Sequence, residues 1–308
     1  MRITASRTPV RSGAGVATIV PRLLANALII ATVGGGALLV AFPFIWMVLG
    51  SFKTVQESNL FPPTFLPRTW HPQNYLEAWT KPPSTLGRYL LNSALTAIVG
   101  TAGQLMIGVL AAYAFARLRF RGRDLLFLLV LATTMIPSEI TLIPNFVTIR
   151  HLPLLGGNDL LGNGGQGLYD SYAAMILPGL AGAFPIFLLR QTFLGVPNEY
   201  WEAAQIDGTS NFGYLWRILL PLTGPPLITV ALLGFVGRWN ALLWPLLVTR
   251  RESIRPVQVA MTYFQDENVT NYGLLVAAAF LVTVPIILLY LVAQRRFIEG
   301  VTTGGLKG

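Results

Sequence analysis

The sequence predicts an all-α, polytopic membrane protein with six transmembrane helices and with both termini in the cytoplasm. Of its 308 residues, 53% are hydrophobic and only 11% are charged, whereas soluble domains carry about 25% charged residues. The apolar residues fall in long blocks, each near the roughly 20 residues that a helix needs to cross the hydrocarbon core. These two observations exclude a soluble globular enzyme and a disordered chain.

Six apolar segments are the predicted spans, and each must be helical because backbone groups cannot stay unpaired in lipid. The spans are Leu23–Leu49, Leu90–Phe115, Leu125–Ile149, Tyr172–Leu189, Leu222–Val248 and Tyr272–Ala293. Charged residues interrupt only two of them, at Glu139 in the third and Arg238 in the fifth. We expect a cytoplasmic tail at residues 1–22, a membrane domain at 23–293 and a second cytoplasmic tail at 294–308.

The distribution of basic residues predicts the orientation. The segments on the side of the N-terminus hold more Lys and Arg than the loops on the other side, as cytoplasmic segments do. The run Arg117, Arg119, Arg121 and Arg123 supports this orientation most strongly, and the Arg250–Arg255 cluster opposes it. The net charge of +9 is therefore explained by anchoring at an anionic membrane face rather than by nucleic-acid binding.

The two longest outer loops differ in composition. Ser51–Gly87 is rich in Pro, which forbids a continuous helix, and we expect an extended connection with one short helix near Asn74–Trp79. His151–Asp170 contains the Gly-rich stretch Gly156–Gly167 and is predicted to be a flexible outer loop.

Several kinds of chemistry are missing from the sequence. There is no Cys, so neither a disulfide framework nor a thiolate metal site can form. A nucleotide-binding P-loop needs Gly before its Lys-Ser/Thr pair, but Phe52 precedes Lys53-Thr54. The two histidines, His71 and His151, lie far apart in outer loops. We therefore expect no catalytic residue, no metal and no cofactor.

Residues 197–221 are predicted to form two short helices at the inner membrane surface. Asn198 is placed to cap the first helix, whose first turn is acidic at Glu199 and Glu202, as the helix dipole favours. Gly208 can adopt the left-handed conformation that ends it. A second helix would then run to Pro221.

Either Thr209 or Ser210 can cap that second helix. The first helix is predicted to expose small and aromatic side chains, namely Tyr200, Trp201, Ala203, Ala204 and Ile206. Such a surface suits the groove of a partner protein. Its shape alone is equally typical of an amphipathic helix that rests on lipid.

The spacing of residues in this loop resembles a known family. The pattern is similar to the loop of permease subunits of bacterial ABC importers. It consists of Glu202-Ala203-Ala204, then Gly208 after three residues, and then Ile218-x-Leu220-Pro221 after nine more. Three further segments resemble carbohydrate importer permeases of the maltose type. They are Ser51–Thr54, Trp239-Asn240 and Gln294–Gly300.

The resemblance implies a non-catalytic subunit in the cytoplasmic membrane of a bacterium or archaeon. Its partners would be a second permease, forming a heterodimer, two ATP-binding cassette subunits and an extracytoplasmic sugar-binding protein. The ATPase-docking residues would be Glu202, Ala203, Ala204, Asp207 and Gly208. The tail Gly300–Gly308 would reach between the ATPases, and Thr249–Asn271 would enter the cleft of the binding protein.

The candidate substrate pathway lies in the fifth span. Arg238, Trp239 and Asn240, with Glu139 from the third span, could contact a sugar, a sugar phosphate or glycerol phosphate. A buried Arg238–Glu139 ion pair is an equally good interpretation. The alternative function is a stand-alone secondary transporter or channel that uses Glu139 and Arg238 within the membrane.

Overall fold

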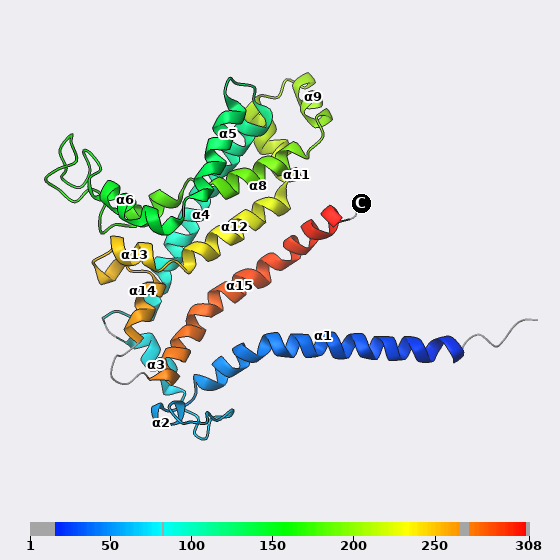
Figure 1. The fold of residues 1–308 in the computed structure, drawn as a ribbon, viewed down its shortest axis with the longest axis vertical. Helices are drawn as coiled ribbons and strands as arrows, with labels where there is room; N and C mark the ends of the chain where they lie inside the picture. The colour runs from blue at the N-terminus through cyan, green and yellow to red at the C-terminus, as the bar shows by residue number, and fades with distance from the viewer. Residues whose placement is uncertain (1–15, 82, 265–270, 306–308) are drawn as a thin grey trace, which may run out of the picture.

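The computed structural model describes residues 16–81, 83–264 and 271–305, with side chains from residue 26 to residue 294 of those ranges. Regular structure in these residues is entirely helical (Figure 1), so the predicted all-α class is confirmed. Three helices are long and apolar enough to cross a membrane, and three bent helix pairs raise the number of spans to six if each pair counts as one. Parts of both predicted tails, residues 1–15 and 306–308, lie outside the described residues.

The three long helices contain the first, second and sixth predicted spans. They are α1 (Val16–Gly50), α4 (Leu86–Arg117) and α15 (Tyr272–Gly305), and each continues past the predicted end of its span. Figure 1 shows α1, in blue, extending away from the other helices. Its large apolar side chains between Leu28 and Phe44 are exposed.

The third predicted span, Leu125–Ile149, is bent rather than one straight helix. Helix α5 (Arg123–Ala132) continues through the 3-10 turn η1 (Thr133–Met135), and α6 (Ser138–Arg150) leaves at an angle of 104°. The break falls at Ile136-Pro137, because a residue that precedes Pro is pushed out of the α region.

The fourth predicted span is also bent. Helix α7 (Tyr172–Ile176) and the 3-10 turn η2 (Leu177–Gly179) meet α8 (Ala183–Leu194) at 47°. Pro178 lies at the start of η2, where its missing N–H weakens the helical ladder.

The helices in the fifth predicted span, Leu222–Val248, have other bounds than the predicted segment. Helix α12 covers Gly224–Trp239, and a separate helix α13 covers Leu243–Val248. On the other side, residues 211–222 form helical turns that meet α12 at 85°. The residues Arg238, Trp239 and Asn240 therefore lie at the end of a helix rather than at the middle of a span.

Short helices build the segments that connect the spans. Helix α2 is Val55–Ser58, and α3 is Gln73–Thr80, which confirms the short helix predicted near Asn74–Trp79. The buried amide of Asn74 donates to the backbone carbonyls of Ser51, at 2.8 Å, and Lys53, at 2.9 Å. This bond pair fixes α3 against the end of α1.

The segment that follows α13 packs on the N-terminal half of α4. It contains η4 (Glu252–Ile254), α14 (Val257–Met261) and η5 (Thr262–Phe264). Ser93 Oγ accepts the N–H of Val257 at 2.8 Å.

The Gly-rich loop at 151–170 is held by its own hydrogen bonds, which the prediction of a flexible loop did not include. The Asn158 amide donates to the carbonyls of Arg150 and Leu152, and Asp159 accepts the N–H groups of Leu161 and Asn163. Several of its glycines adopt positive φ values, which explains why the loop needs them.

Helix α4 lies at the centre of the packed core. One apolar cluster joins it to α8, α12 and the 197–221 loop, and includes Val109, Tyr113, Leu189, Phe193 and Leu219. A second cluster joins its other half to α12, α14 and α15. The two clusters fix the helices that form the candidate site.

Candidate functional site

Residues 197–221 form the predicted helix–turn–helix. Helix α9 is Glu199–Ile206, and Gly208 follows with a φ of +72°. Ser210 caps the next helix, α10 (Asn211–Tyr214), by accepting the N–H of Gly213 at 3.1 Å. The predicted turn at Gly208 and the predicted cap at Ser210 are therefore confirmed.

The predicted capping role of Asn198 is wrong. Its side chain makes no capping bond to α9, and its Oδ1 instead accepts a hydrogen bond from Arg117. The guanidinium of Arg117 also donates to the carbonyls of Phe193, at 2.7 Å, and Val196, at 2.6 Å. Arg117 thus joins the end of α4 to the end of α8 and the start of α9.

Two of the five residues predicted to be exposed on α9 face the bundle instead. Ala204 is buried in the core cluster, and the Trp201 ring packs edge-on against Tyr214 at a centroid distance of 4.8 Å. Positions three apart lie on one helix face, so these residues form the attached face. Of the residues predicted to dock the ATPase, Ala204 is therefore buried, whereas Glu202, Ala203, Asp207 and Gly208 are exposed.

The free face of this segment carries exposed apolar side chains, four of them large, and we call it the α9 patch. It consists of Tyr200, Ala203, Ile206, Phe212 and Trp216. Ile206 is 86% exposed and Phe212 is 63% exposed, as is typical of an interaction site rather than a folded core. Phe212 and Trp216 were not predicted, although two aromatic residues four apart on a helix are a recognisable signal.

A cavity of about 430 Å³, with polar side chains set in a mostly apolar lining, lies between α4, α6, η2 and α12. Its polar lining comes from Gln104, Ser138, Thr141, Asn145 and Arg238. Oε1 of Gln104 is buried and has no hydrogen-bond partner in the described part of the chain. The sequence analysis missed Gln104, although an amide within an apolar helix is a signal for a polar pathway.

The side chain of Arg238 reaches this cavity between Gly100 and Gly179. It donates a hydrogen bond to the carbonyl of Gly179. A Cβ atom at Gly100 would lie 2.3 Å from Nε of Arg238, so a larger residue at this position on α4 would require the Arg238 side chain to shift. The guanidinium is thereby positioned by backbone groups rather than by an acid.

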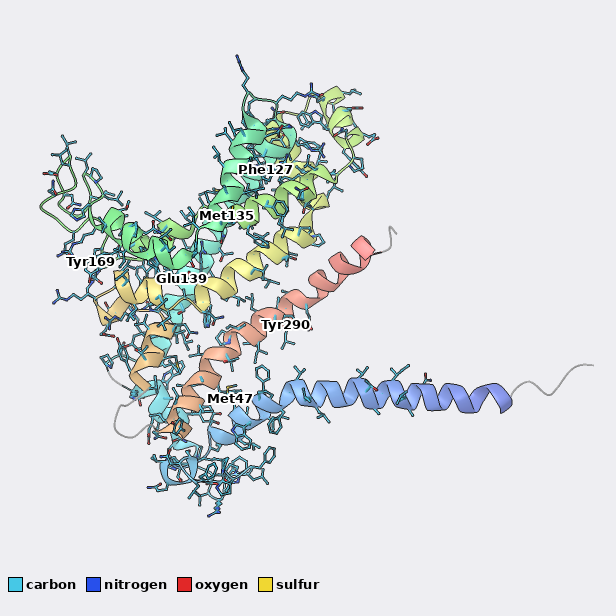
Figure 2. The ribbon with its side chains drawn as sticks, in the orientation of Figure 1. Met47, Phe127, Met135, Glu139, Tyr169 and Tyr290 are labelled. Atoms are coloured by element: carbon cyan, nitrogen blue, oxygen red, sulfur yellow. The ribbon has the colours of Figure 1, made fainter. Side chains whose placement is uncertain are left out.

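The predicted ion pair between Arg238 and Glu139 does not form in the described structure. Glu139 is exposed at the first turn of α6, where it accepts from Ser138 at 3.0 Å. Figure 2 shows Glu139 and Met135 on either side of the bend between α5 and α6. The bend places Glu139 away from Arg238, which weakens the interpretation of these two residues as an ion-coupling pair.

The two residues that follow Arg238 do not line the cavity. Trp239 is buried and stacks on Phe235 at a centroid distance of 5.6 Å. Asn240 accepts a hydrogen bond from Gln258 at 3.2 Å. Of the predicted pathway residues, the structure brings only Arg238 into the cavity.

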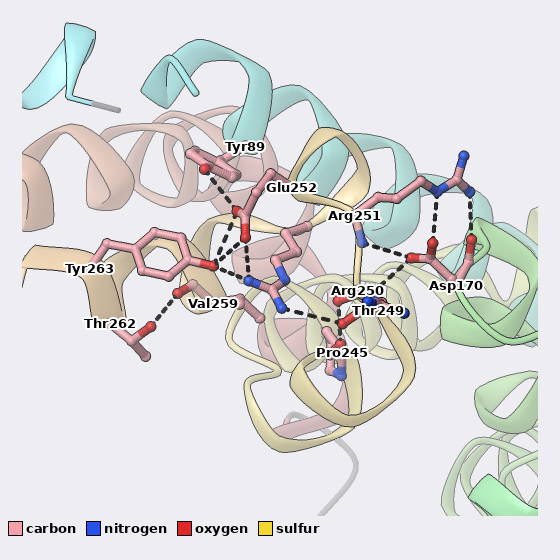
Figure 3. Close-up of polar contacts among 11 residues, drawn as sticks. Tyr89, Asp170, Pro245, Thr249, Arg250, Arg251, Glu252, Val259, Thr262 and Tyr263 are labelled. Carbon is pink, nitrogen blue, oxygen red and sulfur yellow. Dashed lines mark hydrogen bonds and ion pairs between the residues drawn. The ribbon is translucent and has the colours of Figure 1, made fainter. Parts of the chain in front are cut away.

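Carboxylates fasten the segment around η4 and α14, which we call the α14 end (Figure 3). Glu252 accepts hydrogen bonds from Tyr89, at 3.2 Å, from Tyr263, at 3.0 and 3.1 Å, and from Arg255. These bonds connect η4 to α4 and η5.

Asp170 closes the Gly-rich loop onto the same segment. It accepts the N–H of Arg250 at 2.8 Å and the guanidinium of Arg251 at 2.7 Å. Burial opposes ionisation of Asp170, but the N–H groups of Arg251 and Arg250 and the Arg251 guanidinium together lower the pKa of the carboxyl.

Bent apolar helices around a cavity with polar side chains, with an exposed apolar surface on α9, are typical of a multi-pass membrane protein of the transport class. Residues 104–302 match the family of binding-protein-dependent transport system inner membrane components, and the chain belongs to this family. It is therefore a multi-pass protein of the cytoplasmic membrane. The matched range includes both the α9 patch and most of the cavity-lining elements.

The chain is similar to transport permeases over most of its length. The arabinooligosaccharides transport system permease protein AraQ of Halalkalibacterium halodurans is 33% identical over 274 residues, which are 88% of this chain and 93% of the relative. The sulfoquinovosyl glycerol transport system permease protein SmoH of Agrobacterium fabrum is 33% identical over 269 residues, 87% of this chain and 89% of the relative.

The fold is also similar to that of a solved structure. A chain in the crystal structure of a bacterial ABC transporter involved in the import of the acidic polysaccharide alginate superposes with a TM-score of 0.72 and 24% identity. The match covers 94% of this chain and 100% of that chain.

Proposed function

We propose that the chain is the permease subunit of an ATP-driven importer for carbohydrates or their anionic derivatives, with ATP hydrolysed by separate subunits. The observation that carries the proposal is the α9 patch, an exposed apolar surface on a short helix that is fastened to the membrane helices. A transporter that works alone has no use for such a surface. The docking surface consists of the patch with the neighbouring Glu202, Asp207 and Gly208.

The structure explains how force on the α9 patch would reach the membrane. Arg117 joins α9 to the ends of α4 and α8, and the apolar cluster around Tyr214 joins it to α4 and α12. A displacement of α9 therefore moves these helices together, which is a rigid-body route to alternating access.

The cavity beside Arg238 is the proposed solute pathway. The amides of Gln104 and Asn145 and the hydroxyl of Thr141 offer both donors and acceptors to sugar hydroxyls. Arg238 adds a fixed positive charge. This lining suits a neutral glycan such as the one named for AraQ and an acidic solute such as the one named for SmoH. Trp239, Asn240 and Glu139 would contact solute only in another conformation.

The partners are a second permease, two ATPase subunits and an extracytoplasmic binding protein that delivers the solute. The exposed apolar length of α1 supports a neighbouring membrane subunit, because it contacts little of its own chain. The segment Thr249–Asn271 is the proposed contact for the binding protein, and its residues 265–270 lie outside the described residues. The tail Gly300–Gly308 is proposed to reach the ATPases, although residues 306–308 also lie outside them.

Co-purification of the ATPase subunits with the tagged chain tests the proposal. Ile206→Asp places a charge in the α9 patch and should remove the ATPase subunits from the purified complex. The matched control is Leu160→Asp, which changes a residue that is 76% exposed in the Gly-rich loop and should leave co-purification intact. Full retention of the ATPase by Ile206→Asp would contradict the proposal.

A further inference from the structure

Two adjoining hollows flank the turn that connects α4 to α5. Their volumes are about 470 and 700 Å³, and both Arg119 and Arg123 line each of them. Arg117 lines the larger hollow together with Trp201 and Glu202 of α9. Three arginines and one acid therefore surround the larger hollow, which makes it basic.

The positive charge of this site is poorly compensated. Within the described residues, Arg119 makes no hydrogen bond or ion pair through its side chain. Arg123 pairs with Asp124 at 3.1 Å, but the Asp124 side chain is 76% exposed, and exposed pairs are weak. Arg117 donates only to uncharged acceptors. An anion would find unsatisfied donors here.

The site lies where two membrane helices end. Helix α4 has 32 residues, or a length of about 48 Å, so it exceeds the roughly 30 Å of hydrocarbon and its last residue reaches headgroup depth. Leu125 of α5 lines the smaller hollow, and Leu125 and Leu129 are exposed one turn apart. A basic site thus borders an apolar stripe.

We propose that the two hollows bind an anionic phospholipid, with its phosphate at Arg119 and Arg123 and an acyl chain along Leu125 and Leu129. Arginine forms bidentate hydrogen bonds with phosphate, and basic pockets beside membrane helices accept anionic headgroups. An acidic protein segment would satisfy the arginines but would leave the apolar stripe uncovered. This chemistry favours the lipid.

The bound lipid would contact α9 through Trp201 and Glu202, so anionic lipid content would influence coupling between the ATPase and the membrane helices. Only this consequence rests on the proposed function. Binding of lipid can be measured without ATP, solute or partner subunits, so its failure is separate from a failure of the importer assignment.

A photoreactive phosphatidylglycerol in nanodiscs of phosphatidylcholine tests the site on the full chain. Crosslinks are expected on peptides that contain residues 117–129 or 194–205. The double variant R119Q/R123Q should reduce this crosslinking roughly 25-fold, because each basic residue at a membrane surface contributes about a fivefold preference for anionic lipid. R121Q is the control, since Arg121 is exposed on the same turn and lines neither hollow.

Two results would overturn the proposal. The first is crosslinking of R119Q/R123Q at the level of the wild type, and an accompanying loss of ATPase co-purification would then indicate an acidic protein partner. The second is displacement of the lipid by excess inorganic phosphate, which would indicate a site for free anions. If the double variant does not fold, R119Q alone should lower crosslinking about fivefold, because Arg119 makes no contact that the fold needs.

Discussion

The α9 end and the α14 end of the molecule are fastened by different chemistry. At the α9 end, the cation Arg117 donates to two carbonyls and an amide, none of which can titrate. At the α14 end, the carboxylates Glu252 and Asp170 accept from arginines, tyrosines and backbone N–H groups. One end therefore depends on an arginine and the other on two acids.

This difference in chemistry suits the two ends to different mechanical roles, one that transmits force and one that can loosen. Arg117 and the apolar cluster below α9 form an attachment that neither acid nor the loss of a proton can weaken, which suits an element that transmits force. The α14 end joins η4 and the Gly-rich loop to α4 through charge pairs, so its stability can respond to pH and to ligands that compete for the same groups.

The largest effect is expected for Arg117→Lys. A hydrogen bond from a charged donor contributes about 1.5–3 kcal/mol, and a lysine ammonium cannot reach all three acceptors in the fork geometry of Arg. We expect about 3 kcal/mol less stability of the α8–α9 junction. Hydrogen exchange at residues 194–206 should accelerate, and transport should fall while ATPase subunits still co-purify. Unchanged exchange would show that Arg117 does not fasten α9.

A smaller, local effect is expected for Glu252→Gln. The substitution keeps the shape of the side chain but replaces a charged acceptor by a neutral one, so the contacts with Arg255 and Tyr263 weaken by about 1–2 kcal/mol. Hydrogen exchange should increase in residues 249–264 and should not change in α9. Equal destabilisation of both ends would contradict the separation between them.

The smallest effect is expected from acidification at Asp170. Because the pKa of this carboxyl is lower in the folded protein than its ordinary value of 3.8, its contribution to stability is complete above that value and is lost as pH falls through the folded pKa. Asp170→Asn should remove this acid-dependent part. Melting curves of wild type and variant should converge at low pH and differ near neutral pH. A constant difference at every pH would exclude the titration of Asp170 as the cause.

The sequence predicted local features well where one residue type determines the backbone. Gly208 was expected to adopt a left-handed conformation, and its φ is +72°. Ser210 was one of two expected caps and forms the bond. The predictions failed where a residue distant in the sequence determines the contacts of a side chain. Asn198 pairs with Arg117, which lies 81 positions earlier in the chain, and no local pattern contains that contact.

The membrane spans show a second limit. Hydropathy averages over a window of residues, so a continuous apolar block predicts a straight helix even where the chain bends. Ile136-Pro137 was a visible signal for the bend between α5 and α6. The break between α12 and α13 at residues 240–242 contains no proline itself, but Pro245 cannot donate to the carbonyl of Ala241, four residues earlier, and this weaker signal was not used. Because of this break, Trp239 and Asn240 do not line the cavity, although they were predicted to lie in the pathway.

The central claim, that α9 and its turn couple this chain to a separate ATPase, is tested most directly at Gly208. A Cβ at this position would meet no atom within 4 Å, so Gly208→Val changes only the backbone preference, by about 1–2 kcal/mol. Gly208→Asn is the matched control, because Asn tolerates the left-handed conformation. In the complex assembled with ATPase, second permease and loaded binding protein, the stimulated ATPase rate should be lost in Gly208→Val and kept in Gly208→Asn. A Gly208→Val complex with the wild-type stimulated rate would contradict the claim.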